Sequence, residues 1–364
     1  MSRGAKATQH NVLHLVSGVT DEVMSFLSPA TRELADRGEQ QSVVVLDDPV
    51  NRNNVRQLGK YAKTVRVKSR TNKVGQYRDL YRACILELMR CEPRTLHLHG
   101  MMAYVIGSMA LKTSGLALSV LYSPHGSRSL TSLRLAGWLT LRAGRSLINS
   151  SRNAAIATFS PETSLLASWR ETFVVESPVD DIYLTPRRHE STKPVVIGGG
   201  AKADGNAAET LAQIAVFLSV EEFAISFKWL GDVNAETSAC FKAANIELLD
   251  ANSLSLHAEA LFEAWIYVAP SSTRSYPLLL IQAMATGVPC VALDCLQHRQ
   301  VIEHEVTGYL YSSESEMIVA IAALIDDRAL RKRIGDAAKE SIRKRFGGDE
   351  FRTRLLRSYA AALA

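Results

Sequence analysis

The sequence has no stretch of about 18 consecutive apolar residues, so it predicts no membrane-spanning helix. Its first residues, MSRGAKATQHN, are polar and lack the apolar core of a signal peptide, which predicts that the protein is not secreted. Only five cysteines are present, and none belongs to a C-x-x-C pair. An odd number of scattered cysteines favours free thiols in a reducing compartment. Together these absences predict a cytoplasmic protein.

Acidic residues are missing from two segments of the first half. Residues 51–78 contain nine Lys or Arg, residues 128–152 contain five Arg, and neither segment contains Asp or Glu. Residues 1–180 carry 23 basic and 14 acidic side chains, whereas residues 181–364 carry 19 and 23. A half with so much positive charge is expected to attract anionic partners.

The arginines of residues 130–148 alternate with leucines and a tryptophan, a pattern typical of a helix at the surface of an anionic membrane. We therefore expect segments 51–78 and 128–152 to contact such a surface, at the inner face of the membrane. An ordinary amphipathic helix with a solvated face is the alternative. Nucleic acid is not expected as a partner, because no aromatic recognition motif or zinc spacing accompanies the charge.

Apolar strands alternate with helical segments along the chain, which predicts α/β domains with parallel sheets covered on both faces. A chain of 364 residues that is 47% hydrophobic has room for two such doubly wound domains. Strands are expected at residues 11–17, 42–46, 63–67, 95–99, 117–122, 154–159, 171–176, 195–197, 226–230, 246–249, 266–269, 290–292 and 308–311. Helices are expected at residues 20–37, 75–89, 103–113, 130–150, 206–217, 278–286, 314–346 and 349–363.

The order of these elements predicts an N-terminal domain at residues 1–178 and a second domain at residues 195–347. Residues 179–194, rich in proline and charge, are expected to link them. Residues 348–364 are expected to form a helix that packs back toward the first domain. Ligands of such folds bind at the carboxyl ends of the strands, in the cleft between the domains.

Several segments resemble the GT-B fold glycosyltransferases of group 1, also called family 4. The resemblance covers nearly the whole chain and is carried by WIYVAPSSTRSYPLLLIQAMATGVPCVA, FKWLGDVN and HEVTGYLY in the second half, and by RTLHLHG, LYSPHGS and RSYAAALA elsewhere. It implies two Rossmann-like domains, one for the acceptor and one for the nucleotide sugar. It also implies transfer of a sugar to a lipid-linked or saccharide acceptor with retention of configuration, without a metal or other cofactor.

The sequence departs from the family where an E-x7-E motif is usual, because Arg274 and Gln282 occupy the two glutamate positions. Gln282 retains an acceptor oxygen for a ribose hydroxyl, but Arg274 offers only donors. An arginine and a lysine that usually face the pyrophosphate are also missing, and Gly199, Gly200 and Lys202 stand in that region. Gln300 replaces another common glutamate. We expect Arg274 to act as the pyrophosphate clamp; a decayed donor site is the alternative.

The resemblance assigns further residues by position. His125, in Ser-Pro-His-Gly, is expected at the reaction centre together with Arg274, and Gly18 and His99 on the acceptor side. His97 and His99 share one face of a strand, and the sequence supplies no third ligand that would make them a metal site. His298 and His304 are expected in a surface loop. The remaining residues expected to contact the donor are Gly231, Ser275, Tyr276, Pro277 and Leu278.

Two other functions remain open. The changes at Arg274, Gln282 and the pyrophosphate region suit a catalytically inactive GT-B protein that binds a partner or a glycan. An enzyme that acts on another phosphate ligand with the same fold is a third reading, without a positive feature in its favour.

Overall fold

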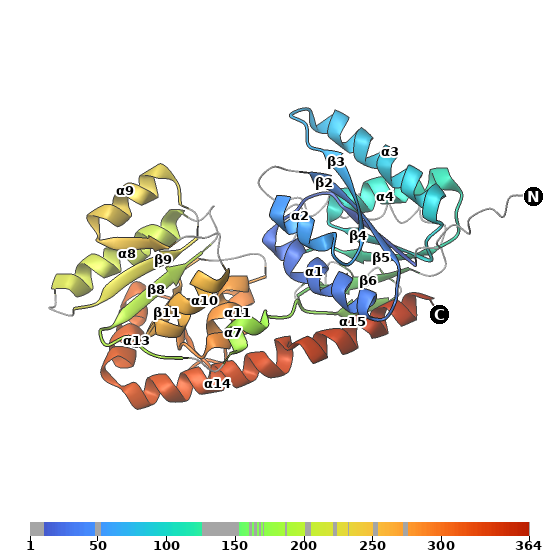
Figure 1. Ribbon diagram of the computed structural model, residues 1–364. Coiled ribbons are helices and arrows are strands. Elements are labelled where there is room, and N and C mark those ends of the chain that lie inside the picture. Colours follow the sequence, from blue (N-terminus) through green and yellow to red (C-terminus); the bar gives the residue numbers. More distant parts are fainter. Residues whose placement is uncertain are drawn as a thin grey trace, which may run out of the picture. The chain divides into compact units, whose positions relative to one another are not determined.

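The computed structural model describes two compact α/β units (Figure 1). The first comprises residues 1–178 and 348–364, and the second comprises residues 179–347. The described residues are 11–47, 52–125, 153–159, 162–163, 166, 169, 171–185, 188–200, 205–220, 224–231, 233–249, 254–271 and 276–363. The predicted class of two doubly wound α/β domains is confirmed.

The first unit is built on a sheet of seven parallel strands in the order β3-β2-β1-β4-β5-β6-β7. Strand order reverses between β1 and β4, which is where doubly wound folds place their ligands. Most of its strands are buried on both faces, as their continuous apolar sequences predict. The strands are β1 (Val12–Val16), β2 (Gln41–Asp47), β3 (Lys63–Lys68), β4 (Thr95–His99), β5 (Ser119–Ser123), β6 (Asn153–Ala157) and β7 (Glu171–Val174).

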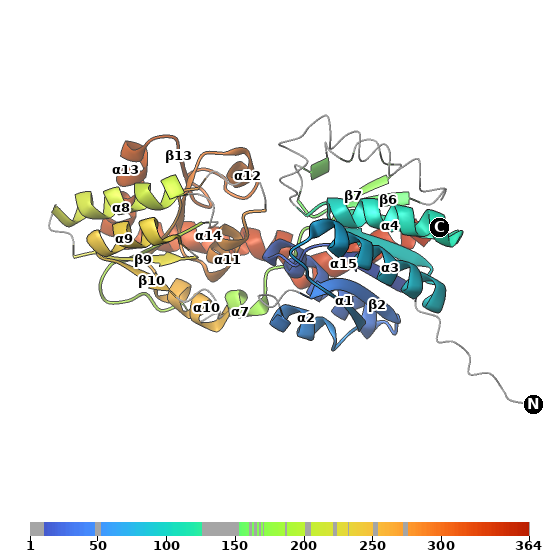
Figure 2. The same ribbon diagram turned by 90° about the horizontal axis from the view of Figure 1, so that it is seen from above.

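Helices cover both faces of this sheet. Helices α3 (Lys73–Cys91) and α4 (Met101–Ser114) pack on one face, and α1 (Asp21–Asp36) and α2 (Arg52–Leu58) pack on the other (Figure 2). Helix α15 (Gly348–Leu363) joins α1 on its face and contacts β5, β6 and β7. The C-terminal residues are therefore part of the first unit's core.

The inner side of α15 is apolar and its rim is charged. Phe351, Leu355 and Tyr359 share a buried cluster with Phe26 of α1. At the rim, Arg352 Nε lies 2.6 Å from an oxygen of the mostly buried Glu33. These contacts fix α15 against α1 through both burial and charge.

The second unit contains a sheet of six parallel strands in the order β10-β9-β8-β11-β12-β13. Its strand order reverses between β8 and β11, as in the first unit. The strands are β8 (Val195–Gly199), β9 (Ser226–Leu230), β10 (Ile246–Leu249), β11 (Ile266–Ala269), β12 (Cys290–Leu293) and β13 (Tyr309–Tyr311). The helices are α7 (Asp181–Leu184), α8 (Gly205–Val220), α9 (Ala235–Ala243), α10 (Leu254–Glu263), α11 (Leu278–Thr286), α12 (Leu296–Arg299), α13 (Glu314–Asp326) and α14 (Arg328–Phe346).

The segment 179–194 belongs to the second unit. Asp180 caps α7 by accepting a hydrogen bond from the amide of Ile182, and α7 buries Tyr183 completely. Further on, Glu190 forms ion pairs with Arg188 and Arg331. The charges that make the segment look like a linker are thus used in contacts within this unit.

Arg331, at the start of α14, is almost completely buried. Its Nη1 donates to the carbonyl oxygens of Leu324 and Ile325 at 2.7 and 2.9 Å, which satisfies the last turn of α13. Its Nη2 lies 3.3 Å from a carboxylate oxygen of Glu190, and its guanidinium lies 3.8 Å from the ring centre of Trp265. This one side chain connects α13, α14 and the segment before β8.

One surface prediction is wrong. His298 lies in α12 and is buried, and its Nδ1 lies 2.6 Å from the carbonyl oxygen of Leu293. Burial lowers the pKa of His298 below its usual value. The side chain of His304 is about half exposed, in agreement with the prediction for that residue.

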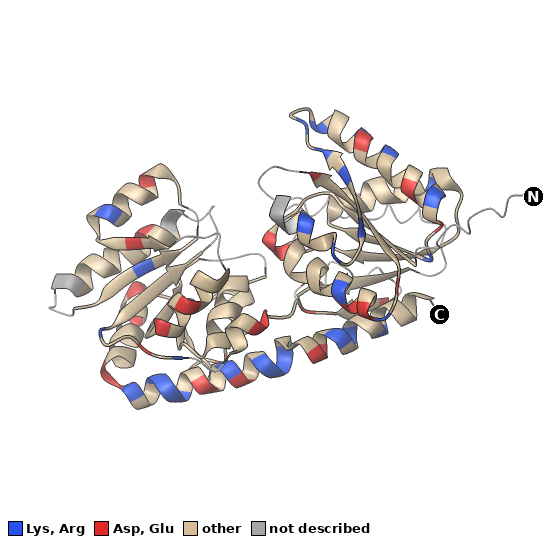
Figure 3. Cartoon of the chain, viewed as in Figure 1, with Lys and Arg blue, Asp and Glu red and all other residues tan. Residues whose placement is uncertain are grey.

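Strand β3 carries three exposed basic residues, Lys63, Arg66 and Lys68. Figure 3 shows Lys and Arg of the described residues in blue. Lys63 forms an ion pair with Glu87 of α3. The other acid-free segment, residues 128–152, and its expected helix at 130–150 lie almost wholly outside the described residues. Among the helices that the structure describes, none combines the length and the apolar character needed to cross a bilayer.

The closest approach of α11 and α14 occurs at two glycines, which predicts a large effect of a single methyl group. Gly287 ends α11 in the left-handed conformation, with φ of 83°, and a Cβ on Gly335 of α14 would overlap the carbonyl oxygen of Gly287. Helix propensity alone would make Gly335→Ala stabilising by about 1 kcal/mol. We expect the opposite, a loss of about 3 kcal/mol in the free energy of unfolding, because two backbones must separate.

Urea denaturation followed by circular dichroism measures this difference. Gly348→Ala is the matched control, because a Cβ there meets nothing within 4 Å, and we expect a change within about 0.5 kcal/mol. Equal stability of Gly335→Ala and the native chain would show that the helices do not approach as closely as described.

Candidate functional site

Three glycines lie at the carboxyl edge of the second sheet, next to the reversal of strand order. Gly199 ends β8 and Gly200 follows it, and Gly231 follows β9 with φ of 125°. A Cβ on Gly231 would lie 2.8 Å from the carbonyl oxygen of Gly200, and one on Gly200 would lie 2.8 Å from Oγ of Ser271, which follows β11. Gly231 therefore meets Gly200 backbone to backbone, and Gly200 leaves room for the side chain of Ser271. Without side chains of their own, these glycines let a ligand that carries phosphate approach the main chain.

Packing explains part of this glycine run. A Cβ on Gly199 would lie 2.5 Å from the hydroxyl oxygen of Tyr267, and Gly198 faces Leu211 and Trp229 just as closely. Gly198 is consequently required by the core, whereas Gly200 and Gly231 shape the edge of the sheet.

Trp229, on β9, is a polar feature of this edge that was not predicted from the sequence. Its indole Nε1 is buried and has no hydrogen-bond partner among the described residues. This nitrogen would lie 3.5 Å from a Cβ on Gly231, so it faces the glycine edge. A buried N–H without an acceptor costs free energy, and a polar ligand atom at this edge would satisfy it. The signal was the tryptophan of FKWLGD, which looks like an ordinary core residue in the sequence.

Helix α11 follows β11 and so begins near the same edge. Its first turn has no side-chain cap, and Pro277 occupies the N-cap position. The amide of Leu278 donates to the carbonyl oxygen of Tyr276, whose ring packs against Phe346 at 6.2 Å between centres. Gln282 lies just over one turn into the helix and is buried. The uncapped amides of this turn are suited to an anion.

Arg274, Ser275 and Lys202 lie outside the described residues. Of the predicted donor-side residues, the structure therefore brings Gly199, Gly200 and Gly231 together. Tyr276, Pro277, Leu278 and Gln282 lie at or in α11.

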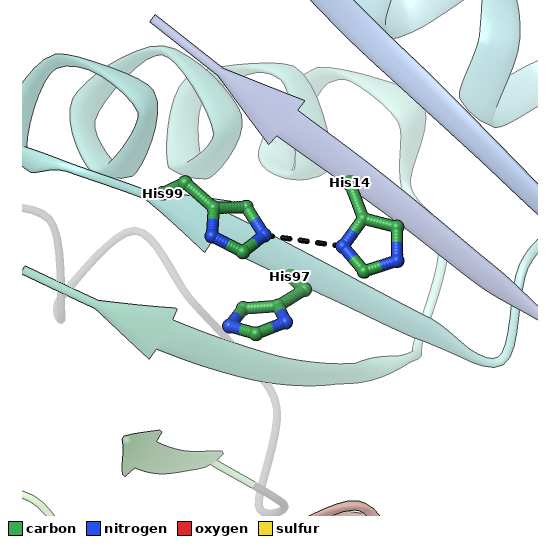
Figure 4. A group of neighbouring side chains, drawn as sticks. All are labelled: His14, His97 and His99. Carbon is green, nitrogen blue, oxygen red and sulfur yellow. Dashed lines mark hydrogen bonds between the residues drawn. The ribbon is translucent and has the colours of Figure 1, made fainter. Parts of the chain in front are cut away.

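Four histidines form a buried cluster in the first unit. His14 on β1 is in register with His97 on β4, and His99 lies two residues further along β4 (Figure 4). His14 Nδ1 lies 3.1 Å from His99 Nε2, and His99 Nδ1 lies 2.8 Å from His125 Nε2. The ring of Phe26 borders three of the imidazoles, with centres 5.3 to 6.2 Å away.

All four imidazoles are neutral at neutral pH, because burial disfavours the charged form. Desolvation lowers the pKa of His14 to about 4 and that of His125 to about 3. It also lowers the pKa values of His97 and His99 well below the usual value, and the neighbouring imidazoles add to this effect. Neutral imidazoles carry one N–H donor and one acceptor nitrogen each.

His125 follows β5 and has the left-handed backbone conformation, with φ of 52°. This region is uncommon for a residue with a Cβ and is often found at functional sites. Its Nδ1 is buried without a hydrogen-bond partner among the described residues. Gly18, after β1, is exposed, and a Cβ there would meet nothing within 4 Å. The structure thus brings His99 and His125 together, and it leaves open space at Gly18.

His14, His97 and His99 lie close enough to be tested as metal ligands, since one nitrogen of each falls within 4.8 Å of the others. Both nitrogens of His97, however, have partners: Nδ1 lies 2.7 Å from Tyr359 Oη and Nε2 lies 2.9 Å from Ser123 Oγ. Both nitrogens of His14 also have partners, Gln41 and His99. A metal would have to replace these hydrogen bonds, so the arrangement fits paired imidazoles and not a ligand set.

Part of the second unit matches a known family model. Residues 193–327 match the family model described as glycosyl transferases group 1. The chain is 34% identical over 95 residues to N-acetyl-alpha-D-glucosaminyl L-malate synthase of Bacillus anthracis, which is 26% of this chain and 25% of that protein. The chain spans about a quarter of the length of the curated relatives it matches.

Over 96% of its length the chain has the fold of solved GT-B glycosyltransferases. Sucrose-phosphate synthase from Thermosynechococcus elongatus superposes with a TM-score of 0.77 at 15% identity, over 96% of this chain and 98% of that one. Anabaena HepE, solved in complex with UDP and glucose, gives a TM-score of 0.74 at 16% identity, over 96% of this chain and all of that one.

Proposed function

We propose that this chain, whose residues 193–327 match the group 1 glycosyl transferases and whose fold is GT-B, is a glycosyltransferase. It transfers a sugar from a nucleotide-sugar donor to a lipid-linked or saccharide acceptor in polysaccharide or glycolipid synthesis. The observation that carries the proposal is that the family match spans β8 to α13 and so contains the whole glycine edge with α11. A neighbour of the same fold was solved with UDP and glucose, which supports a nucleotide sugar as the donor.

In this proposal the second unit holds the nucleotide diphosphate. Gly199, Gly200 and Gly231 give access to main-chain amides, and Trp229 adds an indole N–H. The start of α11, with Tyr276, Pro277 and Leu278, lies against the diphosphate, and the helix dipole there favours negative charge. Gln282 accepts a hydrogen bond from a ribose hydroxyl.

Arg274 and Lys202 supply the positive charge that the departing diphosphate requires, in place of the pair usual in the family. A guanidinium binds two phosphate oxygens at once, and main-chain dipoles add to its effect. The reaction therefore needs no metal ion in this proposal, and it retains the configuration at the anomeric carbon, as the family resemblance implies.

In the first unit, His125 and Gly18 lie toward the reacting sugar, with His99 behind His125. The exposed basic side chains of β3 support contact with an anionic membrane that carries a lipid-linked acceptor.

Substitution of Arg274 by alanine is expected to weaken binding of UDP or GDP by about tenfold to a hundredfold, because a charged hydrogen bond contributes about 1.5–3 kcal/mol. Gln282→Ala is expected to weaken it by about fivefold, since one neutral hydrogen bond is lost. Isothermal titration calorimetry in buffer with EDTA measures both, and it tests binding without a metal at the same time.

Arg328→Ala is the matched control, because this arginine is 87% exposed and lies outside the proposed donor site. Unchanged binding in Arg274→Ala would exclude the clamp. No heat with any nucleoside diphosphate or nucleotide sugar would exclude the donor site itself.

The replacement of two usual glutamates by Arg274 and Gln282 also favours a second candidate function. In it, the chain is an inactive GT-B protein that binds a partner or a glycan. Release of nucleoside diphosphate from a panel of nucleotide sugars separates the two, because only the enzyme turns over. Turnover that arises only in the double variant Arg274→Glu with Gln282→Glu would identify the native chain as the inactive form.

A further inference from the structure

A chain of hydrogen bonds runs from helix α1 through Gln41, His14 and His99 to His125. The Nε2 group of Gln41 donates to the carbonyl oxygen of Thr31 at 2.8 Å. The Oε1 atom of Gln41 lies 3.2 Å from His14 Nε2, and the contacts from His14 to His99 and from His99 to His125 follow. Gln41, His14, His99 and His125 are all at most 5% exposed.

The direction of this chain follows from its first bond. A backbone carbonyl only accepts, so the amide nitrogen of Gln41 must face Thr31 and its oxygen must face His14. Because that oxygen also only accepts, His14 carries its proton on Nε2, and its Nδ1 is left as an acceptor. The same reasoning places the proton of His99 on Nε2 and then the proton of His125 on Nε2.

The last nitrogen of the chain, His125 Nδ1, consequently carries a lone pair and no proton. It is the buried nitrogen that has no partner among the described residues, and its residue has the strained left-handed backbone. A buried acceptor that is held in one orientation and one tautomer is ready for a donor group of a ligand.

We propose that Gln41, His14 and His99 are positioning residues that present His125 Nδ1 as a hydrogen-bond acceptor for a hydroxyl group of the sugar substrate. This inference rests on the proposed function for the identity of the ligand, and on the structure alone for the direction of the chain. His97 lies outside it, because its two nitrogens face the hydroxyls of Tyr359 and Ser123, which can donate or accept.

The proposal makes an unusual prediction for Gln41, which is three hydrogen bonds away from His125 Nδ1. In Gln41→Leu the Nε2 proton of His14 would be buried without an acceptor. Moving that proton to Nδ1 avoids this loss only if His99 and His125 also move theirs, so all three tautomers reverse together. His125 Nδ1 then becomes a donor and can no longer accept from a hydroxyl.

Nitrogen-15 NMR of histidine-labelled, full-length protein without ligand tests this, since the two ring nitrogens of a neutral imidazole have well-separated shifts. Each signal is assigned by its loss in the corresponding His→Gln variant. In the native chain we expect His14, His99 and His125 to be protonated on Nε2. In Gln41→Leu the ratio of Nδ1–H to Nε2–H at His125 is expected to rise at least tenfold.

Gln41→Glu is the matched control, because a carboxyl group keeps the acceptor oxygen toward His14 and, when protonated, can still donate to Thr31. Its tautomers are expected to match those of the native chain. A native His125 protonated on Nδ1, or a His125 that does not respond to Gln41→Leu, would overturn the proposal. Should Gln41→Leu not fold, the spectrum of the native protein alone decides the direction of the chain.

The functional step is measured separately, as release of UDP from UDP-glucose. Loss of at least tenfold in rate in Gln41→Leu, with the native rate in Gln41→Glu, is expected if the lone pair of His125 receives a sugar hydroxyl. Reversed tautomers with an unchanged rate would overturn the role toward substrate. Absence of UDP release in the native chain would count against the proposed function for this donor, while the NMR result still decides whether the three residues set the tautomer of His125.

Discussion

Replacing Arg331 by methionine is expected to lower the free energy of unfolding of the second unit by about 3 kcal/mol. The substitution leaves the carbonyl oxygens of Leu324 and Ile325 without their donor and removes the shortest contact of Glu190 with α14. It also removes the guanidinium from the face of Trp265. Methionine fills most of the space, so the loss reports the polar contacts more than a cavity. Urea denaturation gives the difference from the native chain.

Arg328→Met, three residues earlier in the same helix, is the control for this experiment. Its side chain is 87% exposed and its nearest contact with Glu190 is 3.9 Å, so we expect a change of at most about 0.5 kcal/mol. If Arg331→Met lowers the free energy of unfolding no more than Arg328→Met does, the buried contacts of Arg331 do not stabilise the second unit.

The free energy of unfolding of the first unit is expected to fall as the pH drops below about 6.5, well before carboxylates become protonated. The pKa values of His14, His97, His99 and His125 are lower in the folded chain than in the unfolded chain. The unfolded chain therefore binds protons first as the pH falls below about 6.5, and folding stability decreases from there. The loss continues until the pH reaches the folded values, about 4 for His14 and about 3 for His125.

Each of these histidines is expected to cost about 1.4 kcal/mol of unfolding free energy per pH unit below pH 6.5. The four together are expected to lose on the order of 8 kcal/mol between pH 7.5 and 5, almost all of it below pH 6.5. Unfolding free energies from urea titrations across this range measure the slope. His97→Gln is expected to reduce the slope by about a quarter, since one of four protons is no longer taken up. The control His189→Gln, a side chain that is 62% exposed, is expected to leave the slope unchanged. A native chain equally stable at both pH values would contradict the buried, neutral cluster.

Most strands and several helices follow from local sequence, because continuous apolar runs between turn residues have few alternatives. The helix at Leu278–Thr286 begins and ends where the sequence places it, between Pro277 and Gly287. Helices α9 and α10 were missed, because they are short and the residues that they bury, although at helical spacing, include the polar Thr237 and His257. Helix α7 was hidden in a segment that proline and charge made resemble a linker.

The site was harder to predict because it depends on strand order. Alternation along one strand reveals that His97 and His99 share a face, but only the pairing of β1 with β4 brings His14 to them. The local sequence does not predict a role for Gln41, because that role depends on the direction in which its amide group faces Thr31 and His14. The donor-side glycines were visible as a run, whereas Trp229 looked like core until its unpaired N–H was located.

The place of α15 in the first unit has a consequence for how the chain is made. Residues 179–347 leave the ribosome before residues 348–364, so the second unit is complete while the first still lacks a helix of its core. Until α15 is made, Phe26 lacks the apolar side chains that cover it, and His97 Nδ1 lacks its hydrogen-bond partner Tyr359. The nascent first half is therefore expected to be a client of chaperones, and the order of folding during synthesis to run opposite to the order of translation.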